Sequence, residues 1–304
     1  MGSAKELSMA PDRCVFGPGL FLNLKTTSGM RTAIDCWSCM HIIADSINIM
    51  NPKVGQALQD LDPEPIRGLA SRCSRAGVDA VDINPGPLRT QAKKRLALLV
   101  ETVQEETGLP LVLDGNDAEL MQFALDLCRQ RPILNGFSLE PQRLEAMLPL
   151  AVERGCRIVG FLLNEQSQVP GGLEERLETF QHLYELSMES GLEPEQLIID
   201  PVIVPLMWEN GISQAQAVLD TIAHLPEMVG HSVATVVGLS NLTTSSSGHS
   251  RSVVEQAYLS MLTRAGLDMA LMNPERSGVM ATAAFCNLLQ GSDIFTWAEV
   301  EQFL

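Results

Sequence analysis

Short runs of branched apolar residues alternate along the chain with longer amphipathic stretches, from Met40 to Leu289. Such short branched apolar runs are typical of strands that are buried on both faces of a parallel sheet. Each run is closely followed by Asn or Asp. The runs predict eight strands, listed in chain order: His41–Ile47, Ala80–Ile83, Leu111–Leu113, Ile133–Leu134, Arg157–Leu163, Leu197–Ile199, Ala234–Gly238 and Met269–Met272. The stretches between them predict helices at Asp62–Ala76, Leu88–Glu106, Ala118–Cys128, Pro141–Glu153, Leu173–Ser190, Ser213–His224, Ser252–Ala265 and Ser277–Leu289.

The even alternation of strands and helices predicts the fold class. Each connection is short, and a strand–helix–strand repeat of this kind requires a parallel sheet. Eight such pairs in about 260 residues match the size of a closed (β/α)8 TIM barrel, an α/β fold. An open doubly wound sheet is the alternative, although such sheets seldom repeat so evenly. Neither G-x-G-x-x-G nor G-x-x-x-x-G-K-[ST] follows any predicted strand, so neither nucleotide-binding fingerprint is present.

Residues 1–39 differ from the rest of the chain, because glycine, proline and threonine interrupt every periodic pattern there. We expect this segment to be an irregular N-terminal extension, or a tag followed by a leader. Residues 40–304 are expected to form the barrel domain. Cys36 and Cys39 have the spacing of a redox or half-zinc motif, but a second CxxC or a nearby His pair that would complete a zinc site does not occur.

The charge balance narrows the classes of partner. The 304 residues include 21 Lys and Arg against 37 Asp and Glu, which gives a net charge of -16. This acidity argues against nucleic acid or an anionic membrane as the main partner, and no apolar run reaches about 18 residues, the length that a membrane span needs. Seven scattered cysteines are typical of a reduced compartment, so we expect a cytoplasmic protein.

The polar residues that follow the strands form the candidate site. They are Asn48, Asn84, Asp114, Asn135, Asn164, Asp200, Asn241 and Asn273. Asn and Asp favour turns and helix N-caps, and this explanation is adequate for any one position. It explains the whole set less well, because Asp117, Ser138 and Ser250 already stand at later capping positions. In parallel α/β folds ligands bind at the carboxyl ends of the strands.

This rim is rich in carboxamides and carboxylates and poor in cations. A phosphate site requires Arg, Lys or a glycine-rich nest, and only Arg251 lies nearby. The histidines stand in no metal-ligand spacing, so we expect no bound metal. Asn and Asp side chains are suited to a planar, neutral heterocycle, because a carboxylate accepts two adjacent N–H groups and an amide both donates and accepts.

Several motifs, in this order, resemble the pterin-binding methyltransferases: VDINPG (81–86), LVLDGND (111–117), ILNGFSLE (133–140), IIDPVIVP (198–205) and VVGLSN (236–241). Phrases without obvious catalytic use, such as GLEPEQLIIDP (191–201), are also similar. The resemblance implies a dihydropteroate-synthase-like barrel that moves a methyl group between 5-methyltetrahydrofolate or tetrahydrofolate and a corrinoid. Because no cobalamin domain is attached, the corrinoid would be carried by a separate protein. A homodimer is implied by the resemblance alone.

The same resemblance assigns residues. Asp114, Asn135 and Asp200 would bind the pterin ring, Asn241 would lie near N5, and Ser240, Asn48, Asn84 and Arg251 would complete the pterin site. Asn241, Asp114 and Asp200 would be catalytic, with the proton passing through a network that includes the two carboxylates. Thr244 stands where the family often has Gln, and Ala44-Asp45-Ser46-Ile47-Asn48 replaces the family's Gly-Glu-Arg-Ile-Asn. Both departures affect the surroundings of N5.

Three alternatives remain. The first is a pterin-condensing enzyme of the dihydropteroate synthase type. The Ser-Arg-Lys sequence of those enzymes is missing here, where the chain has GLSN, and this disfavours that alternative. A catalytically inactive module that binds a pterin or docks a corrinoid protein is suggested by Thr244 and the altered first strand. A structural barrel with an incidental polar rim is the third.

Overall fold

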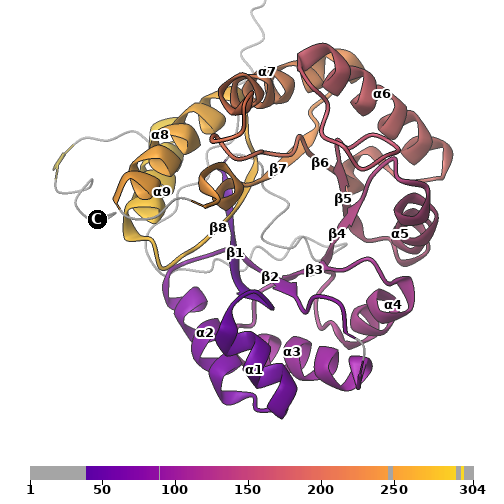
Figure 1. Cartoon of the computed structure of the whole chain (residues 1–304), viewed down its shortest axis with the longest axis vertical. Coiled ribbons are helices and arrows are strands. Elements are labelled where there is room, and N and C mark those ends of the chain that lie inside the picture. The colour runs from indigo at the N-terminus through magenta and orange to yellow at the C-terminus, as the bar shows by residue number, and fades with distance from the viewer. Residues whose placement is uncertain (1–38, 89, 246–248, 292–295, 298–304) are drawn as a thin grey trace, which may run out of the picture.

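Eight parallel strands close into a barrel in the computed structural model. The structure describes residues 39–297 except 89, 246–248 and 292–295. Neighbouring strands pair in chain order, and β8 closes on β1. The helices form an outer ring around the strands (Figure 1). The strands are β1 (His41–Asn48), β2 (Ala80–Asn84), β3 (Leu111–Asp114), β4 (Ile133–Phe137), β5 (Arg157–Phe161), β6 (Leu197–Asp200), β7 (Ala234–Gly238) and β8 (Met269–Met272). The predicted (β/α)8 fold is confirmed.

The helices agree with the predicted order but include one more. They are α1 (Pro52–Asp60), α2 (Glu64–Arg75), α3 (Ala92–Thr107), α4 (Ala118–Leu127), α5 (Pro141–Arg154), α6 (Leu173–Glu189), α7 (Gly211–Val229), α8 (His249–Ala265) and α9 (Ser277–Gly291). Two 3-10 turns, η2 (Pro194–Gln196) and η3 (Leu239–Thr243), are also present. Helix α1 was not predicted, although Asn51 caps it through the Lys53 N–H and Pro52 opens it.

Some predicted bounds and caps were wrong. Strand β5 ends at Phe161 rather than Leu163, and β4 continues to Phe137. Asp117 caps α4 by accepting from the Leu120 N–H at 3.1 Å, as expected. Ser138 instead accepts from the Glu140 N–H in the turn before α5, and Ser250 lies inside α8. Most of residues 1–39, including Cys36, lie outside the described residues.

An apolar cluster that includes a buried side chain from every strand forms a core of its own. Its members are Ile43, Ala80, Val112, Ile133, Val159, Ile198, Val236 and Met269. A second, larger core lies between the strands and the ring of helices. Because the barrel is packed rather than hollow, a ligand site must lie at one of its ends.

The strand register brings the predicted rim residues to the same level. Asn48 pairs with Asn84 across β1 and β2, and Asp114 pairs with Asn135 across β3 and β4. Within the part of the chain that the structure describes, no helix is long and apolar enough to cross a membrane.

Candidate functional site at the carboxyl ends of the strands

Turn chemistry accounts for part of the polar rim. In five cases a side-chain oxygen accepts from the backbone N–H two residues later: Asn48 from Met50, Asn84 from Gly86, Asn164 from Gln166, Asp200 from Val202 and Asn273 from Glu275. These bonds are 2.7–3.0 Å long. Asn164 also accepts from the Gln168 N–H at 2.9 Å. The local explanation is therefore sufficient for Asn164 and Asn273, whereas Asn84 has a second partner across the rim.

Two acid–amide pairs form the centre of the rim. The Asn84 amide donates to Asp114 Oδ2 at 2.6 Å, and the Asn135 amide donates to Asp82 Oδ1 at 3.4 Å. Asp82 and Asn135 are 3% and 7% exposed. The structure thus brings together three predicted residues and adds Asp82, which the sequence analysis did not select. The sequence feature that could have identified Asp82 is a carboxylate inside an otherwise apolar strand.

Burial makes ionisation of the carboxyl groups in this cluster unfavourable. Burial raises the pKa of Asp82 well above its usual range, the charge of Asp114 raises it further, and the hydrogen bond from Asn135 opposes both effects. Burial also raises the pKa of Asp114, opposed by the Arg143 charge and by the Asn84 amide. Two neighbouring buried carboxyl groups do not readily ionise together. The cluster can therefore accept or release a proton beside a bound heterocycle.

Asp200 lies at the end of β6 and is 9% exposed. Burial raises its pKa to about 7, while the Val202 N–H and the positive charge of Arg176 oppose that rise. Val202 has a φ of 62°, so the chain bends sharply after Asp200 and its N–H points back to the carboxylate. A carboxyl group with this pKa changes its charge near neutral pH, which suits a proton relay.

Turn η3 carries Ser240 and Asn241. The Ser240 hydroxyl donates to Asp45 Oδ2 at 2.8 Å and so ties η3 to β1. Burial raises the pKa of Asp45, and the hydrogen bond from Ser240 opposes this. Asn241 is exposed, and a Cβ at Gly238 would stand 3.0 Å from its amide nitrogen, so glycine leaves room for that side chain. The Asn241 amide is therefore open to solvent, whereas Asp82 and Asp200 are buried.

Arg251 takes part in a buried charge cluster behind η3. Its Nε donates to Thr243 Oγ1 at 3.0 Å and to Glu255 Oε1 at 3.2 Å. Glu255 is 1% exposed and also accepts from Thr243 and Arg276. Burial alone would raise the pKa of Glu255, but these partners hold the pKa below its usual value. The cluster fixes η3 against α8 and the loop after β8.

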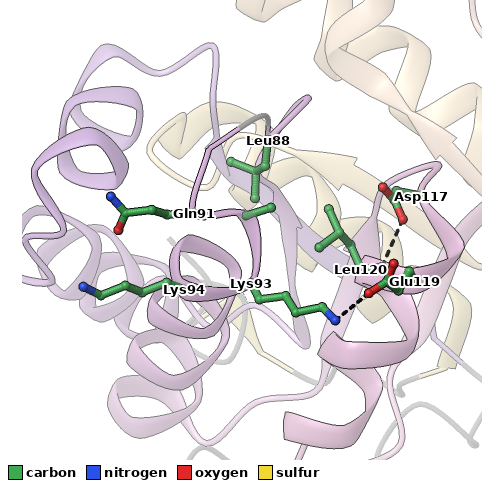
Figure 2. Close-up of a pocket in the computed structure, with 8 residues that line it drawn as sticks. Leu88, Gln91, Lys93, Lys94, Asp117, Glu119 and Leu120 are labelled. Atoms are coloured by element: carbon green, nitrogen blue, oxygen red, sulfur yellow. Dashed lines mark hydrogen bonds and ion pairs between the residues drawn. The ribbon is translucent and has the colours of Figure 1, made fainter.

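A surface hollow of about 430 Å³ lies between the first turns of α3 and α4 (Figure 2). Lys93 on α3 and Glu119 on α4 form an ion pair of 2.5 Å across it. Its lining residues are Leu88, Gln91, Ala92, Lys93, Lys94, Asp117, Glu119 and Leu120. None of the predicted site residues is among them. Within the described part of the chain, His, Cys, Asp and Glu side chains do not gather into any group of three that could hold a metal.

Comparison with known proteins identifies the family of this chain. A family model described as pterin binding enzyme matches residues 46–273. The methylcorrinoid:tetrahydrofolate methyltransferase of Eubacterium limosum is 25% identical over 84% of this chain and 92% of its own length. The methionine synthase of Mycobacterium leprae is 21% identical over 77% of this chain, which matches 20% of that longer protein. The resemblance drawn from the motifs is confirmed.

Solved structures with the same fold are dihydropteroate synthases. The Xanthomonas albilineans enzyme with 4-aminobenzoic acid superposes with a TM-score of 0.62 at 16% identity, covering 86% of this chain and 95% of that one. The Yersinia pestis enzyme in a sulfonamide drug complex gives 0.60 at 16% identity, covering 84% and 95%. At these identities the likeness establishes the barrel fold alone.

Proposed function

Because the chain belongs to the pterin binding enzyme family, we propose that it is a methyltransferase that acts between N5 of tetrahydrofolate and the cobalt of a corrinoid on a separate protein. The relative that supports this reaction class most directly is the methylcorrinoid:tetrahydrofolate methyltransferase, which aligns over most of both chains. The observation that carries the proposal is the pair of acid–amide contacts, Asn84 with Asp114 and Asn135 with Asp82, at the mouth of the packed barrel.

These pairs suit the edge of a pterin. A pterin edge presents alternating N–H donors and ring acceptors, and carboxylates and carboxamides are complementary to that pattern. Asp114, Asn135 and Asp200 would take the ring, with Asp82 holding the Asn135 amide in orientation. Asn48 and Asn84 would shape the neighbouring wall through their turns. In this arrangement most of the specificity comes from hydrogen bonding to carboxyl and carboxamide groups, and no resident metal is required.

The chemistry of methyl transfer is set by the proton on N5. In one direction N5 attacks the methyl group, the cobalt–carbon bond breaks, its electron pair remains on cobalt as cobalt(I), and the N5 proton leaves. In the other direction N5 must be protonated before it can leave as a neutral amine. Positioned proton transfer of this kind is worth about 10²–10⁴-fold. The carboxyl groups of Asp114 and Asp200 would relay the proton, whereas Asn241 would orient N5.

A dihydropteroate-synthase-like reaction is the alternative that the fold favours. Condensation with a diphosphate leaving group calls for cations that are free to bind it. Arg251 and Arg276, which lie beside η3, are both paired with the buried Glu255. This pairing supports the methyltransferase over the synthase. A homodimer and a cytoplasmic location remain part of the proposal and rest on the family resemblance and on the cysteine usage.

An anaerobic spectral assay with methylcobalamin and tetrahydrofolate tests the proposal. Purified protein should generate cobalt(I), and Asn241→Ala should slow the reaction by about 10²-fold, the usual effect of one lost orienting donor. Asn164→Ala is the matched control, because Asn164 also follows a strand but is engaged in its own turn. If calorimetry detects tetrahydrofolate binding and no cobalt(I) forms from methylcobalamin, the protein is either an inactive pterin-binding module or strictly requires the corrinoid on its carrier protein. The methyltransferase proposal fails if a methylated corrinoid protein also gives no cobalt(I).

A further inference from the structure

Arg176 is a fully buried cation that is not hydrogen-bonded to any carboxylate among the described residues. It lies on α6 with 0% exposure. Its Nη1 donates to the Pro201 carbonyl, and its Nη2 donates to Gln214 Oε1 on α7. Its Nε is buried without a hydrogen-bond partner in the described structure. Helices α6 and α7 lie beside β6 in the outer ring (Figure 1), so the guanidinium reaches the strand end from behind.

A buried guanidinium is costly unless its charge is compensated. Burial lowers the pKa of Arg176 to about 10, so the group stays charged at neutral pH. The titratable groups that face it are Asp200 from β6 and Tyr258 from α8. Burial raises the pKa of Tyr258, whose hydroxyl donates to the Ala215 carbonyl at 2.7 Å, so Tyr258 is neutral. Asp200 is therefore the one facing group among the described residues that can supply a compensating negative charge, and it does so once the pH rises through its pKa of about 7.

The contacts of Arg176 also fix the backbone that carries Asp200. The carbonyl that it binds belongs to Pro201, the next residue, and the N–H of Val202 returns to the Asp200 carboxylate at 2.7 Å. Gln214, which is 4% exposed, extends the network by donating to the Gly171 carbonyl at 2.9 Å. The guanidinium thus ties the loop before α6, the bend after β6 and the first turns of α7 into one unit.

We propose that Arg176 is a positioning residue for Asp200, holding the Asp200–Val202 bend through the Pro201 carbonyl and supplying the positive charge that favours the carboxylate form of Asp200. The consequence for the pterin rests on the proposed function. A carboxylate accepts two N–H groups side by side, whereas a protonated carboxyl group loses half of that capacity. Arg176 would then set the pH range in which Asp200 binds the ring, without touching the ring itself.

An NMR titration of protein labelled with ¹³C at the Asp carboxyl groups tests the proposal without any substrate. Asp200→Asn identifies the Asp200 signal by its loss. In Arg176→Gln, which keeps an amide donor for the Pro201 carbonyl but lacks the charge, the Asp200 midpoint should rise by about one to three pH units, the usual effect of an opposite charge nearby. Arg176→Lys, which keeps the charge, should leave it within about half a pH unit.

Gln214→Glu provides a second route if the Arg176 variants fail to fold. It has nearly the same shape as Gln214 and places a carboxylate against the guanidinium, which neutralises the charge in place. The Asp200 midpoint should again rise, and Gln214→Met, which leaves the cation intact, is its control. An Asp200 midpoint that stays at the wild-type value in the folded Arg176→Gln or Gln214→Glu protein overturns the proposal.

Measuring tetrahydrofolate affinity as a function of pH distinguishes an electrostatic effect of Arg176 on Asp200 from a general loss of structure around Asp200. Arg176→Gln should bind weakly near pH 7 and recover at least half of the lost affinity, on a logarithmic scale, as the pH rises past the new midpoint. A purely structural defect would weaken binding equally at every pH, and that result would also overturn the proposal. The titration needs no ligand, so the two proposals can fail separately. If the wild type lacks methyltransferase activity but the Asp200 midpoint still rises in Arg176→Gln, the proposed function is refuted and this inference stands.

Discussion

Replacing Asp200 by asparagine should make the folded protein more stable at neutral pH while it impairs the site. The folded state holds the Asp200 carboxyl group in a place where ionisation is unfavourable, and burial raises its pKa from 3.8 to about 7. An isosteric amide removes that unfavourable ionisation and can still accept from the Val202 N–H. Functional sites commonly retain such a destabilising group because activity depends on it.

The size of the effect follows from the pKa of Asp200 in the folded and in the unfolded chain. A pKa difference of one between the two states corresponds to about 1.4 kcal/mol, so a difference of about three corresponds to about 4 kcal/mol. The folded pKa lies above the unfolded pKa, so the folded state binds the proton more tightly and the wild type is favoured at low pH. The stabilisation of the folded wild type by this proton is fully present below about pH 4 and is lost as the pH rises through about 7.

Urea unfolding at two pH values measures the difference in the free energy of unfolding between Asp200→Asn and wild type. Because the sequence pI is about 4.7, both values should lie above it, for example pH 5.5 and pH 8. The stability advantage of Asp200→Asn over wild type should grow from about 2 kcal/mol at the lower pH to about 4 kcal/mol at the higher one. Glu209→Gln, an exposed change in the same loop, controls for net charge. Parallel stability–pH curves for wild type and Asp200→Asn would refute the reasoning.

Two further predictions concern the other polar clusters. Glu255→Gln should lower the free energy of unfolding by about 3–5 kcal/mol in urea titrations, because it leaves Arg251 and Arg276 without their buried counter-charge; an unchanged midpoint would contradict that account. Asn84→Ala should weaken tetrahydrofolate binding in calorimetry by about 5- to 150-fold, or about 1–3 kcal/mol, because the half-buried Asp114 carboxyl group loses the donor that holds it in position for the ring. Equal affinity in wild type and variant would separate this pair from the pterin site.

The barrel could be predicted from the sequence because each strand carries its own signal. An apolar run followed by Asn or Asp marks a strand end locally, and eight such ends in even alternation leave few alternatives to a closed sheet. Helix α1 was missed although Asn51, Pro52 and the buried Val54, Ala57 and Leu58 give a cap and a helical spacing. A (β/α)8 barrel needs only one helix after each strand, so the repeat itself does not call for a helix before α2.

The supporting residues of the site were harder to predict, because their partners are distant in the chain. Asp82 meets Asn135 only after β2 and β4 are placed around β3. Arg176 and Glu255 lie on helices, where a charged side chain is normally solvated, and only the packing of α6 on α7 and of α8 on η3 shows them to be buried. Sequence reasoning therefore found side chains at strand ends and missed those that hold them from behind.

The polar residues of the rim differ in exposure. Asp82, Asn135 and Asp200 are buried, so a pterin held by them would have its polar edge shielded from water. Asn241, on η3, is exposed. Under the proposed function N5 would lie beside this exposed side chain. The Ser240–Asp45 contact and the Glu255 cluster hold η3 in place without covering it. Under the same proposal, the exposed Asn241 leaves N5 open to a corrinoid carried on a partner protein.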